Sequence, residues 1–206
     1  MTREELLDDL NYARSLAEEG RHAPLIGGAF PVFFGTLLAI TWTTHWALVT
    51  GQFDPWLSIN PGALWLGFGV VSAIGAPIVS ASMGKKAGKT AIGNRTDQAV
   101  WNACIGAIIA VVAGTLLAAV MRDDSHAPDA IMAACFGFYG IALSTTARMA
   151  GKRWLGAFGL LAFVFSAVLW VFNPEPWAYL IAAAGAVIVL ITPGIVIMRH
   201  EPATIV

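Results

Sequence analysis

The chain has 206 residues, of which 57% are hydrophobic and only 12% are charged, and its formal net charge at pH 7 is −1. This composition excludes an ordinary soluble domain, because such a domain carries charged residues along the outer face of each surface helix. The few basic residues stand in short segments and form no extended basic stripe, so we expect no nucleic-acid partner.

Residues 1–21 are predicted to form a cytoplasmic amphipathic helix. Thr2 and Glu5 fit a capping box, and Gly20 is a plausible stop. The apolar positions that share one arc of this helix are Leu6, Leu7, Leu10, Ala13, Leu16 and Ala17. Because six acidic residues stand against two arginines, an anionic lipid surface should repel the segment. The arc is therefore predicted to dock on protein: the chain's own basic loops, a second copy, or a cytoplasmic or membrane protein partner.

Six long stretches without a formal charge follow, at residues 22–53, 55–84, 98–121, 130–147, 154–174 and 176–198. A helix needs about 20 apolar residues to cross a bilayer core, and each stretch has this length or nearly so. The fold class is therefore an all-α polytopic membrane protein. Its transmembrane domain covers 22–199, with spans near 24–49, 61–83, 99–121, 128–149, 154–172 and 176–198, and a short tail covers 200–206. The N-terminal segment lacks the features of a secretory signal, so the first span is expected to act as an uncleaved insertion signal.

The spans are predicted to pair as three antiparallel hairpins. Each returning helix begins near a proline, at Pro61, Pro128 and Pro176, and ends near a methionine that basic residues follow. Bilayer thickness explains their common length more simply than an internal repeat does. Small residues at four-residue spacing, as in Gly106/Ala110/Gly114 and Gly140/Ser144, predict close packing between the helices.

The basic residues set the predicted orientation. Eleven of the twelve lysines and arginines fall on one side of the six spans, and Arg122 alone falls on the other. Because basic residues in short loops stay in the cytoplasm, both termini are predicted to be cytoplasmic. Most tryptophans then gather near the outer face, which is typical of an interfacial belt; an aromatic-lined pocket is the alternative.

No catalytic, metal or cofactor site is predicted. The uncharged stretches hold no ionisable Asp, Glu, Lys or Arg, which argues against a proton-coupled pump or a charged pore. His45 and His126 share the outer side, and His22 and His200 share the inner side, but neither pair has the spacing of a known metal motif. The chain also lacks a phosphate-binding loop and a nucleophile motif, so it is expected not to be an enzyme. An enzyme acting on lipid or quinone has the least support.

Three prolines, Pro31, Pro77 and Pro193, interrupt predicted spans in the cytoplasmic third of the bundle. Each removes a backbone hydrogen bond, so together they could mark a hinge or a small cavity of the kind found in transporters. The alternative is a set of kinks whose carbonyls are satisfied by neighbouring helices and by hydroxyl groups such as that of Thr192.

The run AEEGRHAPLIGG at residues 17–28, an acidic helix leading into the first span, resembles small bacterial inner-membrane proteins. This resemblance implies a bacterial inner-membrane location and no particular activity. We therefore predict a non-enzymatic regulatory or accessory membrane protein that binds a partner through its N-terminal helix. The alternative is a small transporter or channel for a neutral or apolar solute.

Overall fold

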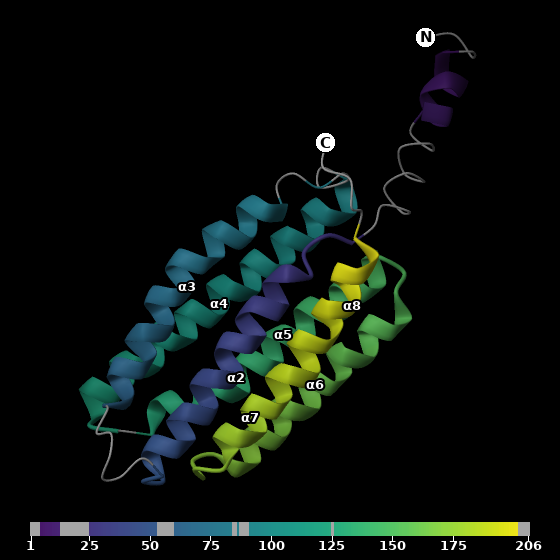
Figure 1. Cartoon of the computed structure of the whole chain (residues 1–206). Helices are drawn as coiled ribbons and strands as arrows, with labels where there is room; N and C mark the ends of the chain where they lie inside the picture. Colours follow the sequence, from purple (N-terminus) through teal and green to yellow (C-terminus); the bar gives the residue numbers. More distant parts are fainter. Residues whose placement is uncertain are drawn as a thin grey trace.

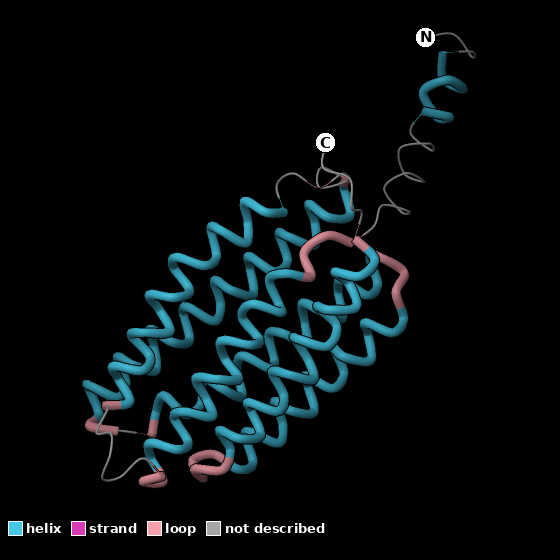
Figure 2. Tube along the Cα trace, in the orientation of Figure 1, coloured by secondary structure: helices cyan, strands magenta, loops and turns pink. Residues whose placement is uncertain are grey.

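The computed structural model describes residues 5–12, 25–52, 60–83, 86, 91–124 and 126–201. These residues form helices and loops without a strand (Figures 1 and 2). The helices of the bundle are α2 (Ala29–Val49), α3 (Pro61–Met83), α4 (Ile92–Arg122), α5 (Ala130–Met149), α6 (Arg153–Phe172), α7 (Ala178–Ala186) and α8 (Thr192–His200). The 3₁₀ turn η1 (Ala127–Asp129) precedes α5, and the π-helical segment η2 (Val187–Ile191) joins α7 to α8.

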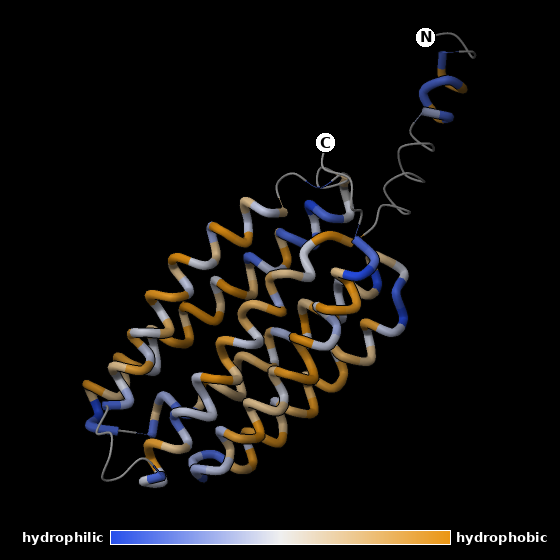
Figure 3. The backbone as a smooth tube through the Cα atoms, in the orientation of Figure 1, coloured by the Kyte–Doolittle hydropathy of each residue, from blue (hydrophilic) through white to orange (hydrophobic). Residues whose placement is uncertain are grey.

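Six helices are long and apolar enough to cross a membrane, because α7, η2 and α8 form one continuous span from Ala178 to His200. This result confirms the predicted multi-pass helical architecture. Apolar residues occupy the middle of the bundle and hydrophilic residues gather at its two ends (Figure 3). We call the end where the described chain enters at Leu25 and leaves at Glu201 the terminal end, and the opposite end the far end (Figure 1).

The predicted span limits hold closely for α3 and poorly for α4. Helix α3 runs from Pro61 to Met83, as expected, because a proline suits the first helical turn. Helix α4 begins at Ile92 instead of near residue 99, and it therefore carries Arg95 and Asp97 in its first turns. Helix α4 has 31 residues and is therefore longer than the hydrocarbon core of a bilayer, so the expectation that ionisable residues stay outside the membrane stays a prediction.

Helices that belong to different predicted hairpins also pack on one another. The most extensive interface joins α5 and α6, which belong to different predicted hairpins. Helix α4 packs on α5, and α2 packs on α3 and along the span formed by α7, η2 and α8. The separation into three hairpins of one design is therefore not confirmed and stays a prediction.

The core lies between α2, α5, α6 and the last span. Phe136 of α5 is its centre, because its ring stacks on Trp42 at 5.8 Å and on Phe165 at 5.5 Å between centroids. The largest fully buried side chains are Trp42, Phe136, Leu155, Leu169, Leu190, Val189 and Pro193. Helices α3 and α4 contribute little to this core: Met83 is the one buried residue of α3.

Some small residues of the helices lie at tight contacts between helices, and others face open space. At Gly159 of α6, an added Cβ would lie 2.3 Å from Oγ of Ser144 and 2.9 Å from its backbone nitrogen, so the backbones of α5 and α6 meet there. At Gly106 and Gly114 of α4, an added Cβ would meet nothing within 4 Å. The predicted close packing therefore holds at the α5–α6 interface, whereas the small residues of α4 face away from the described bundle.

The N-terminal segment is described only in part. Residues 5–12 are helical, and each of them is exposed (Figure 1). The rest of the predicted helix over 1–21 lies outside the described residues, so the complete amphipathic helix stays a prediction.

Candidate functional site

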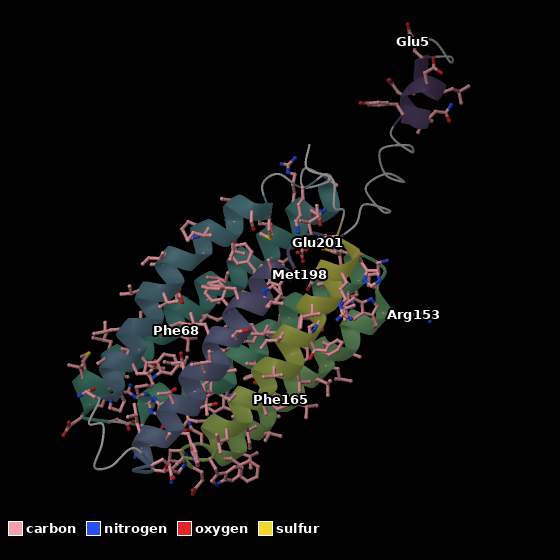
Figure 4. All side chains as sticks on the ribbon, viewed as in Figure 1. Glu5, Phe68, Arg153, Phe165, Met198 and Glu201 are labelled. Carbon is pink, nitrogen blue, oxygen red and sulfur yellow. The ribbon has the colours of Figure 1, made fainter. Side chains whose placement is uncertain are left out.

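Three groups of residues are candidates for function: the apolar residues of the N-terminal helix, a polar cluster at the terminal end, and a polar and aromatic cluster at the far end. The terminal-end cluster is built on a carboxylate. Glu201 follows α8, and its Oε1 accepts hydrogen bonds of 2.9 Å from the backbone N–H groups of both Gly27 and Gly28. Its Oε2 accepts a hydrogen bond from the Lys86 ammonium, which also makes it an ion pair. Figure 4 shows Glu201 at this end, close to Met198.

The glycines make this contact possible. Gly27 has φ 139°, a conformation that residues with a Cβ rarely adopt, and Gly28 directly precedes the first residue of α2. The positive end of the α2 dipole and two unpaired N–H groups then favour an anion at this position. The Glu201 side chain is only 1% exposed, so the carboxylate serves as a buried cap for α2.

The charge state of Glu201 follows from these partners. Burial by itself raises the pKa of the Glu201 carboxyl. The hydrogen bonds from Lys86, Gly27 and Gly28, together with the charge of Lys86, outweigh burial and hold the pKa below its ordinary value. Glu201 therefore remains ionised in mildly acidic solution.

Two side chains of α4 extend the terminal-end cluster. Buried Asn94 accepts a 3.2 Å hydrogen bond from the backbone N–H of Ile26, just before α2. Asp97 accepts a hydrogen bond from the hydroxyl of Thr146, which is buried on α5. These contacts explain why α4 starts early, since its polar first turns are bonded to other segments of the chain.

The far-end cluster joins four elements. The indole N–H of Trp65 on α3 donates a 2.9 Å hydrogen bond to Nδ1 of His45 on α2. The His45 ring stacks on Tyr179 of α7, with centroids 4.2 Å apart and an angle of 16° between the planes. The Tyr179 hydroxyl donates to Asp129 of η1, and the other oxygen of Asp129 lies 3.1 Å from Nδ1 of His126.

The far-end cluster has a defined protonation pattern at its centre. Because Nδ1 of His45 accepts from Trp65, the proton of a neutral His45 ring sits on Nε2. The predicted pair His45 and His126 does meet at one end, but through Tyr179 and Asp129. Across the described parts of the chain, no three His, Cys, Asp or Glu side chains gather as metal ligands would.

The predicted docking residues are exposed where the structure describes them. The exposed fractions of Leu6, Leu7 and Leu10 are 45%, 51% and 63%. The other three members of the predicted arc, Ala13, Leu16 and Ala17, lie outside the described residues.

The three predicted hinge prolines do not share one site. Pro31 falls in the first turn of α2, where its missing N–H breaks no helical hydrogen bond. Pro193 is buried in α8. Its neighbour Gly194 packs on the start of α2, since an added Cβ there would lie 3.1 Å from Cγ of Pro31 and 2.8 Å from the Gly28 carbonyl. Pro77 lies on the exposed side of α3.

The helix adapts to Pro193 in a way that the sequence did not reveal. The turn before it is π-helical over Val187–Ile191, and such a wide turn inside an α-helix is one of the known sources of a kink. Thr192 donates both its backbone N–H and, at 3.0 Å, its hydroxyl to the Val187 carbonyl. Because the Val187 carbonyl also accepts the Thr192 backbone N–H, it is not a carbonyl left free by the proline, and the expected role of the Thr192 hydroxyl stays a prediction.

Comparison of the chain with protein-family models, with curated proteins and with solved structures finds no match.

Proposed function

We propose that the protein is a non-enzymatic regulatory or accessory protein of a bacterial inner membrane, which binds a protein partner through its N-terminal helix. The observation that carries this proposal is the exposure of Leu6, Leu7 and Leu10 on a helical segment. Exposed leucines on one face of a helix are typical of a helix that docks in a groove. The six apolar helices support the membrane location.

The charge of the segment indicates the kind of partner. Glu5, Asp8 and Asp9 stand beside the leucines on this helix. An acidic helix is repelled by anionic lipid and attracted to a basic rim. The partner surface should therefore be an apolar groove bordered by lysines or arginines. No cofactor enters this proposal.

The proposal places the terminal end of the bundle in the cytoplasm, with both chain termini. Its support is that Arg95, Arg148 and Lys152 border the terminal ends of α4, α5 and α6. Short loops with basic residues are retained on the cytoplasmic side. The N-terminal helix would then meet a cytoplasmic protein or the cytoplasmic face of a membrane protein.

Site-specific photo-crosslinking in native membranes tests the proposal. A photoreactive amino acid is placed at Leu7, and the matched control carries it at Asp9 on the same helix. We expect an adduct from Leu7 whose mass exceeds the 21.8 kDa of one chain by the mass of the captured partner. The adduct should be lost in a Leu6→Ser, Leu10→Ser variant, because this change removes the neighbouring apolar contacts.

The outcomes separate the candidate docking partners. An adduct of twice 21.8 kDa identifies a second copy as the partner, and any other increase identifies a different protein. An internal crosslink without a mass increase would show docking on the chain's own loops and contradict the proposal. Equal adducts from Leu7 and Asp9 would also contradict it, because they indicate random collision.

The alternative function, a small transporter or channel for a neutral or apolar solute, has less support. Such a path would use the three prolines together, yet the helices that carry Pro31 and Pro193 are in close backbone contact at Gly28 and Gly194, and Pro77 is exposed on α3. The interior beside them is filled by buried side chains such as Val189 and Leu190.

A further inference from the structure

Helix α3 is the most weakly packed span. Among the described residues, α2 is the one helix with which it shares an extended interface. Its exposed large apolar side chains are Leu66, Val70, Val71, Ile74 and Ile78. In a bilayer, a helix that leaves a protein neighbour for lipid exchanges one apolar surface for another. Polar contacts and close packing therefore determine whether α3 remains against α2.

Polar contacts hold α3 at each end. At the far end, Trp65 donates its hydrogen bond to His45 of α2. At the terminal end, the backbone N–H of Lys86 continues the last turn of α3 by bonding to the Met83 carbonyl, and the Lys86 side chain binds Glu201. Figure 4 shows Phe68, one turn beyond Trp65, in the far half of the bundle and Glu201 at the terminal end.

The two contacts respond differently to acid. Nδ1 of His45 accepts the hydrogen bond from Trp65 only while this nitrogen is unprotonated. A proton on Nδ1 would make it a donor that faces the Trp65 N–H donor, and the hydrogen bond would be lost. The groups that face His45 from other elements are Tyr179 of α7, whose ring stacks on it, and Asp129 of η1, which interacts with it electrostatically. Once His45 is protonated, the Tyr179 ring and the Asp129 carboxylate attract the imidazolium and keep it with α7 and η1, on the side away from α3.

The terminal-end contact persists under the same conditions. The pKa of Glu201 is held below its ordinary value by its hydrogen-bond donors and by Lys86, so the ion pair survives the pH range in which a histidine titrates.

We propose that α3 is a hinged helix: protonation of His45 releases its far end from α2, while the contact between Lys86 and Glu201 keeps its terminal end in place. The movement opens the interface of α2 and α3 from the far end toward Gly75. There, an added Cβ would lie 2.2 Å from the Phe33 ring, so the two helices are in close contact midway along α3. The inference goes beyond the proposed partner binding and does not depend on it.

Distances between spin labels test this inference in the full chain reconstituted in lipid nanodiscs, with Cys104 and Cys135 replaced by alanine. The far-end pair is Leu66→Cys on α3 and Val171→Cys on α6, two positions that are 74% and 73% exposed. We expect its distance distribution to lengthen and broaden by several ångströms between about pH 8 and about pH 4.5, a range that extends well below the ordinary histidine pKa of about 6.5.

A terminal-end pair reports the hinge and the integrity of the fold. Ile78→Cys on α3 and Leu160→Cys on α6 are both 65% exposed, and the distance between these labels should not change over the same pH range. A terminal-end distance that lengthens together with the far-end distance would overturn the hinge, because it would mean that α3 leaves as a whole.

Matched variants assign the response to His45. His45→Gln keeps an acceptor that cannot be protonated, so its far-end distance should be short at both pH values. Trp65→Phe keeps the ring but removes the donor, so its distance should already be long at about pH 8. His126→Gln removes the second histidine of the cluster and should respond as the unmodified protein does. A far-end distance that ignores pH, or one that still responds in His45→Gln, overturns the inference.

Discussion

At the scale of single residues, the Glu201 side chain connects the most distant parts of the chain. Its carboxylate connects the residues before α2, the segment after α3 and the end of α8, which are separated by up to 174 positions in the chain. This contact stabilises the fold because the carboxylate is buried, charged and fully bonded. Loss of the charge would leave two backbone donors and an ammonium group with a weaker acceptor.

We predict that Glu201→Gln lowers the free energy of unfolding by about 1.5–3 kcal/mol at neutral pH, the usual range for a hydrogen bond to a charged group. Because the folded pKa of Glu201 lies below its ordinary value, its contribution is complete above the ordinary value and is lost as the pH falls through the folded pKa. Thermal unfolding of both proteins in detergent at several pH values measures this contribution of Glu201 to stability. The difference from the unmodified protein should shrink in acid.

The matched control for this prediction is Glu175→Gln, which removes an exposed carboxylate from the loop between α6 and α7. It should change the unfolding temperature little at any pH, since exposed charges contribute little to stability. An equal loss of stability in both variants would attribute the effect to net charge instead of the cap.

At the scale of elements, the contrast between α5–α6 and α4 shows where packing is decisive. Gly140 lies against the Phe163 ring, where an added Cβ would be 2.6 Å from the nearest ring atom, and the Ser166 hydroxyl donates a 2.7 Å hydrogen bond to the Ala133 carbonyl. Dispersion and polar contacts of this kind hold helices together in lipid, where the hydrophobic effect between them is absent.

We predict that Gly159→Val destabilises the protein by about 1–3 kcal/mol, because the new side chain would overlap Ser144 and push α6 from α5. The same change at Gly106 on the open side of α4 should cost no more than about 0.5 kcal/mol. Chemical unfolding in mixed detergent compares the two variants. Equal costs would show that helix propensity, and not the α5–α6 contact, determines the result.

At the scale of the whole molecule, the two ends of the bundle differ in chemistry. The terminal end carries Arg95, Arg148, Lys152 and the ion pair of Lys86 with Glu201. The far end carries the aromatic and histidine cluster together with acidic residues such as Asp129. This asymmetry is the physical basis for the orientation that we propose.

The orientation predicts which loops a membrane-impermeant maleimide reaches in intact cells. Glu175→Cys and Lys152→Cys place a thiol in the exposed loops on either side of α6, while the native Cys104 and Cys135 are buried. We expect Glu175→Cys to react in intact cells, and Lys152→Cys to react only after the membrane is opened. The reverse pattern would overturn the cytoplasmic placement of both termini.

The sequence by itself determined the class of the fold and the number of spans. Long uncharged stretches can only be helices in a bilayer, because each backbone N–H and C=O group must be bonded within its own segment there. The ends of α3 at Pro61 and Met83 could also be predicted from residues close to them in the chain. These features depend on composition over about 20 neighbouring residues, which the chain order displays directly.

Only the tertiary structure decided which polar residues meet. Asn94 and Asp97 of α4 bond to Ile26 and Thr146, which stand 68 and 49 positions away in the chain. The sequence also did not predict three other long-range contacts: the pairing of Trp65 with His45, the cap at Glu201 and the extensive α5–α6 interface. Such contacts depend on which helix faces meet across the bundle, and hydrophobic length and loop charge carry no information about that choice.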